Sequence, residues 1–104
     1  MKAIIKGTRY DTANAILIGE ATHAPVRDYT HWEAGLYRTP RGTSHFLAGR
    51  GGPMTQFADV VDHTTRRAGE RIIPLSEADA LEWAEQYLEP EEVERGFGSV
   101  IRDA

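Results

Sequence analysis

Apolar and polar positions alternate most clearly in the middle of the chain. Trp32, Ala34 and Leu36 point to one side of an extended segment, and the residues between them point to the other. Pro40-Arg41-Gly42 then combines a fixed φ with a permissive glycine, which favours a chain reversal. Thr43 to Ala48 again has strand character. The pattern predicts a central antiparallel hairpin over residues 32–48, with one apolar face on the core and one mixed face.

Two other segments have the character of strands. Ala3-Ile4-Ile5-Lys6, a turn at Gly7-Thr8 and a short return at Arg9-Tyr10 predict an N-terminal hairpin, because Gly7 is free to adopt a positive φ. Glu70 to Leu75 predicts one more strand. Pro74 lacks an N–H for the ladder, so it places this strand at a sheet edge or marks its end.

The periodicity changes to that of a helix after Leu75. Ser76 is a favoured N-cap residue, and acidic residues in the following turn suit the positive end of the helix dipole. An apolar stripe and an acidic side predict an amphipathic helix over residues 77–88 that packs on the core. The stripe consists of Leu81, Ala84 and Leu88, with Trp83 and Tyr87 beside it. Pro90 can begin a second short helix to Arg95, which Gly96 would close.

Three segments carry weaker signals. Asp11 or Thr12 can cap a helical turn, and we favour a short helix through Ile18, although Ile16-Leu17-Ile18 is equally compatible with a strand. Gly19 to Tyr29 is expected to be a loop. Met54 to Val61 has apolar residues at helical spacing and predicts another short helix.

These elements together predict an α+β fold. Its small antiparallel sheet would comprise the N-terminal hairpin, the central hairpin 32–48 and strand 70–75, packed by the C-terminal amphipathic helix 77–88. The chain has 104 residues, of which 40% are hydrophobic, and this suffices for one core. We therefore expect a single domain over residues 1–104, with a loosely ordered tail after about residue 98.

The amino-acid composition excludes several kinds of functional site. The absence of cysteine excludes disulfides, thiol nucleophiles and zinc sites built from thiolates, and it is typical of a reducing compartment. The first residues contain an apolar run of only three, Ala3 to Ile5, which is far shorter than a signal-peptide core or a membrane span. We expect a cytoplasmic protein that does not associate with membranes.

Acidic residues are concentrated near the C-terminus. The formal net charge is -4, and residues 77–94 contain eight acids without any Lys or Arg. This face would meet a basic protein surface or imitate a row of DNA phosphates; the alternative is a solvated face that keeps a small protein soluble. The residues proposed to contact a partner are Glu82, Glu85, Glu89 and Glu92, with Tyr37 and Arg38 from the central hairpin.

Aromatic residues of the central region are further candidates for partner contacts, since Trp and Tyr bury much area at low entropic cost. At least two of them must instead belong to the core. They are Tyr29, Trp32, Tyr37 and Phe46.

Catalytic and metal-binding patterns are weak. The four histidines, at positions 23, 31, 45 and 63, match no metal-ligand spacing, so we expect no metal and no cofactor. A base and an orienting carboxylate among Asp59, Asp62 and His63 would be the only enzymatic arrangement, and a surface role is favoured for all three. We therefore expect a protein that is not an enzyme.

A small basic group supports an alternative function. Arg66, Arg67 and Arg71 would contact phosphate in a regulatory or nucleic-acid-binding module. The pI of about 5.5 argues against direct binding to nucleic acid, because such proteins usually present a broad basic surface.

Four stretches of the chain, in order, resemble a group of small proteins encoded by bacterial prophages and other mobile elements and associated with anti-CRISPR loci. The stretches are Lys6-Gly7-Thr8-Arg9-Tyr10-Asp11-Thr12, Leu36-Tyr37-Arg38-Thr39-Pro40-Arg41-Gly42, Phe46-Leu47-Ala48-Gly49-Arg50-Gly51-Gly52 and Ile72-Ile73-Pro74-Leu75-Ser76-Glu77-Ala78-Asp79-Ala80-Leu81-Glu82-Trp83. The chain differs from that group in residues 53–69. The matching residues are structural ones, so no family site residue is transferred.

The resemblance implies an inhibitor that acts in the cytoplasm of a bacterial host. Its partner would be a Cas effector or a subunit of a surveillance complex such as Cascade, and binding would block DNA access or nuclease recruitment. The alternative is the small mobile-element regulatory module described above. The sequence indicates neither the CRISPR type nor the oligomeric state.

Overall fold

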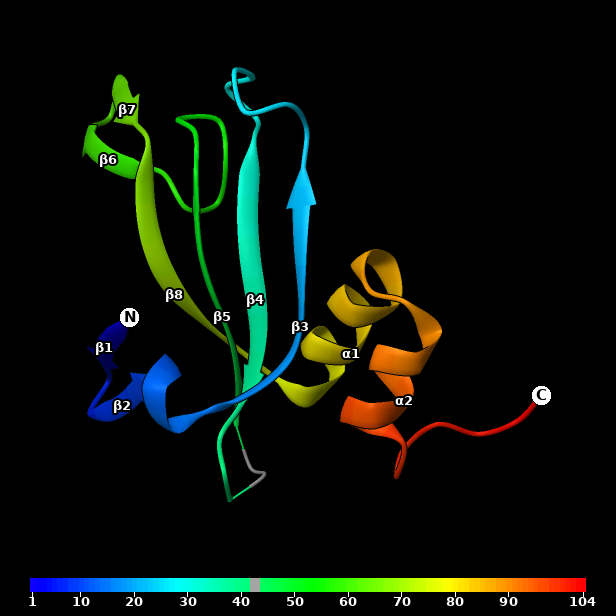
Figure 1. Cartoon of the computed structure of the whole chain (residues 1–104). Coiled ribbons are helices and arrows are strands. Elements are labelled where there is room, and N and C mark those ends of the chain that lie inside the picture. The colour runs from blue at the N-terminus through cyan, green and yellow to red at the C-terminus, as the bar shows by residue number, and fades with distance from the viewer. Residues whose placement is uncertain (42–43) are drawn as a thin grey trace.

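A four-stranded antiparallel sheet lies at the centre of the chain (Figure 1). In the computed structural model, which describes residues 1–41 and 44–104, the strand order is β3-β4-β5-β8. These strands are β3 (Ile16–His23), β4 (Trp32–Arg38), β5 (His45–Gly51) and β8 (Gly69–Leu75). Each pairs only with its neighbours in this order, and β8 is an edge strand, as Pro74 predicted.

Smaller elements are attached to this sheet. They are the hairpin β1 (Lys2–Ile5) and β2 (Thr8–Asp11), the 3-10 turn η1 (Thr12–Asn14), the hairpin β6 (Asp59–Asp62) and β7 (Thr65–Arg67), and the helices α1 (Glu77–Tyr87) and α2 (Pro90–Phe97). The two helices pack against one face of the sheet. The predicted α+β fold, with a C-terminal helix on an antiparallel sheet, is confirmed. The N-terminal hairpin, however, forms a separate two-stranded sheet, and β3 belongs to the central one.

The central hairpin pairs as predicted. Leu36 lies opposite Leu47 and Tyr37 opposite Phe46, so both faces of β4 continue into β5. The amide of Thr39 donates to the carbonyl of Ser44 at 2.9 Å and closes the strand ends. The predicted reversal includes Gly42, which together with Thr43 lies outside the described residues.

The two faces of the sheet bury different clusters. Beneath the helices, Trp32 on β4 packs edge-on against Tyr87 with ring centroids 5.0 Å apart, and it also contacts Trp83 at 6.1 Å. On the other face, the hairpin β1–β2 covers Phe46 and Ile72 and places Tyr10 against Phe46 at 5.4 Å. One half of the second face is thus covered by the N-terminal hairpin.

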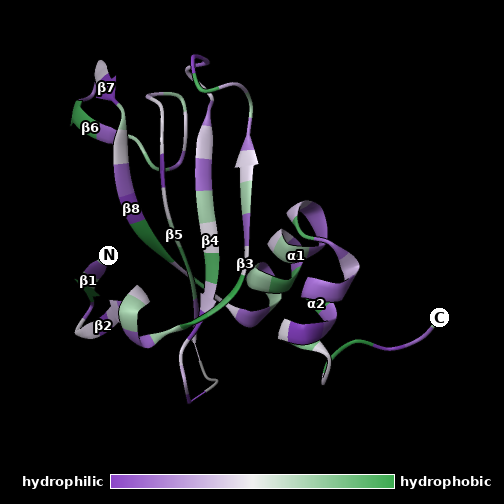
Figure 2. Ribbon diagram, in the orientation of Figure 1, coloured by the Kyte–Doolittle hydropathy of each residue, from purple (hydrophilic) through white to green (hydrophobic). Residues whose placement is uncertain are grey.

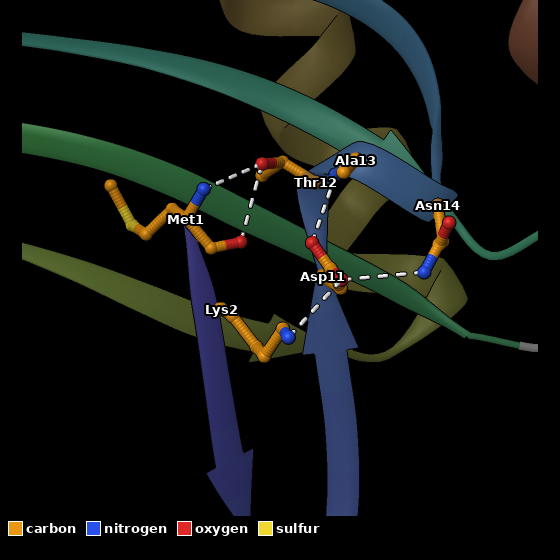
Figure 3. Close-up of polar contacts among 6 residues, drawn as sticks. All are labelled: Met1, Lys2, Asp11, Thr12, Ala13 and Asn14. Atoms are coloured by element: carbon orange, nitrogen blue, oxygen red, sulfur yellow. Dashed lines mark hydrogen bonds and ion pairs between the residues drawn. The ribbon is translucent and has the colours of Figure 1, made fainter.

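Asp11 fixes the end of the N-terminal hairpin (Figure 3). Its carboxylate accepts hydrogen bonds from the amide of Ala13 at 3.0 Å and from the side chain of Asn14 at 3.3 Å, and it lies 4.0 Å from the ammonium of Lys2. The Thr12 hydroxyl accepts from the Met1 amine at 2.8 Å. Asp11 is therefore the predicted cap, although the turn that it caps ends at Asn14.

The predicted helix through Ile18 is wrong, because Ile16 to Ile18 belong to β3. The register shifts between Leu17 and Gly19, so Ile18 is an extra residue in a bulge. Ile18 and Gly19 consequently both face the helices, and this break interrupts the strand alternation. The predicted loop over residues 19–29 is also too long at its start, since β3 continues to His23.

The predicted helix from Met54 to Val61 is wrong as well. Residues 53–57 form turns, in which the Thr55 hydroxyl donates to the Gly52 carbonyl at 2.8 Å and accepts from the Phe57 amide at 3.2 Å. Such side-chain bonds compete with the helical pattern. The chain then enters β6, whose hairpin partner β7 was not predicted.

The C-terminal helices differ from the prediction in two details. The side chain of Ser76 accepts from the Asp79 amide at 3.1 Å, which confirms the cap, but the fully buried side of α1 consists of Ala80, Trp83 and Ala84. Leu81 and Leu88 are only partly buried. Gly96 does not end the second helix, which continues to Phe97.

Gly96 is needed because α2 approaches β3 closely. A Cβ atom on Gly96 would lie 2.6 Å from Cγ2 of Ile18, which is buried. The β3 bulge places this isoleucine under the last turn of α2. No helix within the described ranges is both long and apolar enough to cross a lipid bilayer.

We expect Gly96→Ala to lower the free energy of unfolding by about 1–2 kcal/mol, because overpacking outweighs the gain of about 1 kcal/mol in helix propensity. Urea denaturation would measure the change. Ile18→Leu removes the Cγ2 methyl group, so the double variant should lose less stability than the two single variants added together. Strict additivity, or stabilisation by Gly96→Ala, would contradict this contact.

His45 is a buried titratable residue between the sheet and α2. It is 3% exposed, its ring stacks on Phe97 at 5.3 Å, and its Nε2 has no hydrogen-bond partner among the described residues. Burial lowers the pKa of His45, the charge of Arg38 lowers it further, and Glu77 opposes both effects. The folded state therefore favours the neutral imidazole.

This burial predicts a loss of stability in mild acid. In the unfolded chain a histidine titrates near pH 6.5, so below that pH the unfolded state binds more protons than the folded state. The free energy of unfolding should fall as the pH decreases from about 7.5 to about 5.5, and His45→Phe should show a smaller fall. Urea denaturation at both pH values tests this, and an equal fall in the two proteins would refute it.

Candidate protein-binding surface

Five glutamates on and between the two helices form an exposed acidic helical surface. The acidic helical surface comprises Glu82 and Glu85 of α1, Glu89 between the helices, and Glu91 and Glu94 of α2. Residues three apart lie on the same side of a helix, so each helix presents a pair of neighbouring carboxylates. Figure 2 shows the hydrophilic character of the outward turns of α2.

The five glutamates of the acidic helical surface form no ion pair within the described residues, and the only basic residue on α2 is Arg95 in its last turn. In residues 1–41 and 44–104 the ion pairs are Lys2–Asp11, Arg50–Glu33 and Arg67–Asp59. Like charges three residues apart on a helix are destabilising by a few tenths of a kcal/mol. A cationic partner would remove that repulsion.

Glu92 has a different role from its neighbours. It is half-buried, and its Oε1 accepts a hydrogen bond from the backbone amide of Glu89 at 3.1 Å, across the start of α2. Its Oε2 lies where a Cβ on Gly19 would be only 2.8 Å away, so the side chain packs along β3. Glu92 thus stabilises the helix start, in addition to any partner contact.

Tyr37 and Arg38 lie on opposite faces of the sheet, so the two do not form a common site with the acidic helical surface. Tyr37 packs on the face away from the helices, where it stacks on Phe46 at 5.3 Å, and burial followed by the charge of Glu20 raises its pKa. Consecutive strand residues point to opposite faces, so Arg38 lies on the helix-facing side. Its Nε is buried, with no hydrogen-bond partner in the part of the chain that the structure describes.

The six residues predicted from the sequence thus do not form one surface. Glu82, Glu85 and Glu89 are exposed on or just after α1, and Glu92 is half-buried in α2. Tyr37 lies on the face away from the helices, and Arg38 lies on the helix-facing side. Sequence reasoning had omitted Glu91 and Glu94, although Pro90 signalled the start of the helix that exposes them.

The basic group predicted as a phosphate contact is engaged within the chain. The guanidinium of Arg66 donates to the Thr55 carbonyl at 3.2 Å, and that of Arg71 donates to the Ala58 carbonyl at 3.4 Å. Arg67 lies 3.7 Å from Asp59. The Arg66 bond holds the hairpin β6–β7 against the preceding turns, the Arg67 pair lies within the hairpin, and the Arg71 bond joins β8 to the residue before β6.

The residues considered for catalysis do not form one site. Asp59 pairs with Arg67, whereas Asp62 accepts from both the amide and the hydroxyl of Thr64 at 2.9 Å. The hydrogen bonds from Thr64 lower the pKa of Asp62, which therefore stays ionised as a turn cap. Among the described residues, no three His, Asp or Glu side chains are grouped so that they could hold a metal ion.

Comparison with known proteins adds no assignment: searches of protein-family models, curated proteins and solved structures each found no match.

The different roles of neighbouring glutamates are testable. Glu92→Ala should lower the free energy of unfolding by about 0.5–1 kcal/mol, because the Glu89 amide loses its acceptor. Glu85→Ala removes an exposed carboxylate and should change stability by less than about 0.5 kcal/mol. Thermal and urea denaturation would give both values. Equal effects would show that the bond across the start of α2 contributes nothing.

Proposed function

We propose that this protein is a non-enzymatic, stoichiometric inhibitor whose acidic helical surface binds a basic surface of a partner protein. The observation that supports it is the set of five exposed glutamates without cation partners in the described residues. Such a surface speeds and directs association with a complementary positive surface, and it repels nucleic acid.

The resemblance to proteins of anti-CRISPR loci specifies the kind of partner in this proposal. The partner is a Cas effector or a surveillance-complex subunit in the cytoplasm of a bacterial host. A nucleic-acid channel of such an enzyme is lined with Lys and Arg, and carboxylates that occupy it compete with DNA phosphates. A rigid scaffold with one complementary surface is sufficient for this mode of inhibition.

The contacts of the arginines weigh against the regulatory nucleic-acid-binding alternative. Arg66 and Arg71 already donate to backbone carbonyls, and Arg67 lies beside a carboxylate. An electrophoretic mobility shift with random duplex DNA at low salt distinguishes the alternatives. A shift at micromolar protein would favour the regulatory module over the inhibitor.

Charge reversal on α1 should weaken inhibition. In a phage-protection assay with a CRISPR-bearing host, the protein should reduce immunity, and Glu82→Lys with Glu85→Lys should weaken this effect on the order of tenfold, because like charges then face each other. The matched control is Glu20→Lys with Asp103→Lys, which makes the same charge change at exposed positions elsewhere. The control should retain inhibition.

Affinity purification from the same host identifies the partner. A Cas component should be retained at low salt and released as the salt concentration rises. If no Cas component is recovered and immunity is unaffected, the proposed target is wrong. If the helix variant and the matched control inhibit equally, the acidic helical surface is not the contact.

A further inference from the structure

Three segments meet at the end of the sheet where β3 ends and β4 begins, away from the hairpin β1–β2 (Figure 1). We call this the loop end; it consists of residues 24–31, residues 52–57 and the hairpin β6–β7. The Gly52 amide donates to the His31 carbonyl at 2.8 Å, and the Met54 amide donates to the Tyr29 carbonyl at 3.0 Å. The guanidinium of Arg66 joins the hairpin to these turns through Thr55. The loop end is therefore one connected unit.

The loop end exposes an unusual concentration of large apolar side chains. Five of them are between 54% and 82% exposed. They are Val26, Tyr29, Met54, Val60 and Val61. Figure 2 shows the hydrophobic strand β6 projecting beside hydrophilic segments. Scattered apolar residues are ordinary on a protein surface, whereas a group of this kind on joined loops is typical of an interaction site.

A hollow of about 730 Å³ opens among these loops. Gly51, Gly52 and Gly69 form part of its wall, and a Cβ on Gly52 would lie 2.5 Å from the Tyr29 carbonyl oxygen. Val26 lies at its edge. Because these glycines have no side chains, the neighbouring backbone segments can lie close together and the hollow stays open. Its volume is sufficient for one long side chain of a partner.

The charged groups that line the hollow are mostly carboxylates. Asp28, Glu33, Asp59 and Glu70 face one cationic side chain, Arg50. With His31 neutral, these groups carry a formal charge of -3, from four carboxylates and one guanidinium.

Two of the four carboxylates, Asp28 and Glu70, form no ion pair in the described ranges, although Arg50 lies opposite Glu70 in the register of β5 and β8. Arg50 pairs with Glu33 and Arg67 with Asp59. Hydrogen bonds from the hydroxyl and the amide of Thr30 lower the pKa of Asp28, so this carboxylate is ionised at neutral pH.

We propose that the loop end is a second docking site, which takes a Lys or Arg side chain of a partner protein into this hollow while apolar neighbours of that residue pack on Val26 and Tyr29. The charge complementarity selects this occupant: a cation satisfies Asp28 and Glu70, and an apolar or anionic group leaves both unpaired. An anionic lipid surface is the other kind of partner that binds exposed apolar loops, but the negative charge of the hollow would repel it. The site does not depend on the acidic helical surface or on the proposed inhibitor function.

The site can be tested on the whole chain with a tripeptide. In a ¹H–¹⁵N NMR titration, acetyl-Val-Arg-Val-amide should shift the amides of Gly51, Gly52 and Gly69 and leave α1 and α2 unchanged, with a Kd of roughly 1 mM for a single anchor. Acetyl-Val-citrulline-Val-amide, which has nearly the same shape without the charge, should bind about five-fold more weakly.

Substitutions of Asp28 and Glu70 test whether these carboxylates bind the arginine of the peptide. Asp28→Asn keeps an acceptor for Thr30, and together with Glu70→Gln it should weaken the arginine peptide about five-fold. Asp103→Asn, a single exposed charge change in the C-terminal tail, should not change the affinity. Binding of the two peptides with equal affinity, shifts confined to the helices, or no shifts at all would overturn the proposal. Sedimentation with vesicles of phosphatidylserine and phosphatidylcholine, in place of peptide binding, would identify a lipid surface and also overturn it.

Discussion

The packing of aromatic rings around Trp32 holds the structure together. This side chain projects from a central strand and contacts Phe57 from the turns after β5 and Trp83 and Tyr87 from α1. Each aromatic pair contributes about 0.5–1.5 kcal/mol beyond the burial of apolar area. One residue thus connects the sheet, the helix and the loops. The orientation of α1, and with it that of the acidic helical surface, depends on this cluster.

Glycines determine how closely the layers approach. Gly19 lies where a Cβ would be 2.8 Å from the Leu88 side chain, and a Cβ on Gly49 would be 2.9 Å from the Phe57 ring. Larger residues at these positions would push α1 and the turns away from the sheet. The glycines of β3 and β5 thus leave room for the large side chains that pack over them.

The acidic helical surface and the loop end lie in different parts of the molecule. The helices present carboxylates without counter-ions, and the loop end presents apolar side chains around a negative hollow. The sheet between them supplies a support, since β4, β5 and β8 are continuously paired and β3 pairs with β4 on either side of its bulge. The two proposed contact surfaces therefore lie at different places on one small scaffold. Both would attract cationic groups, so a single basic partner of sufficient size could engage both.

Local signals in the sequence determined the parts of the fold that depend on neighbouring residues. Alternation from Trp32 to Leu36 gave the central hairpin, Ser76 gave the start of α1, and Pro74 gave the edge strand. The exposed glutamates were also evident, because a run of acids without Lys or Arg rarely becomes buried.

Other features were decided only by tertiary structure. Ile16 to Ile18 became a strand because β4 supplied partners and a bulge turned Ile18 toward α2, which no local pattern encodes. The separation of Tyr37 from the helical glutamates likewise follows from which sheet face the helices cover. The hollow at the loop end joins residues from Val26 to Glu70, so its charge existed in the sequence only as scattered single residues. Sequence determined which surfaces are polar, and long-range packing determined which of them lie together.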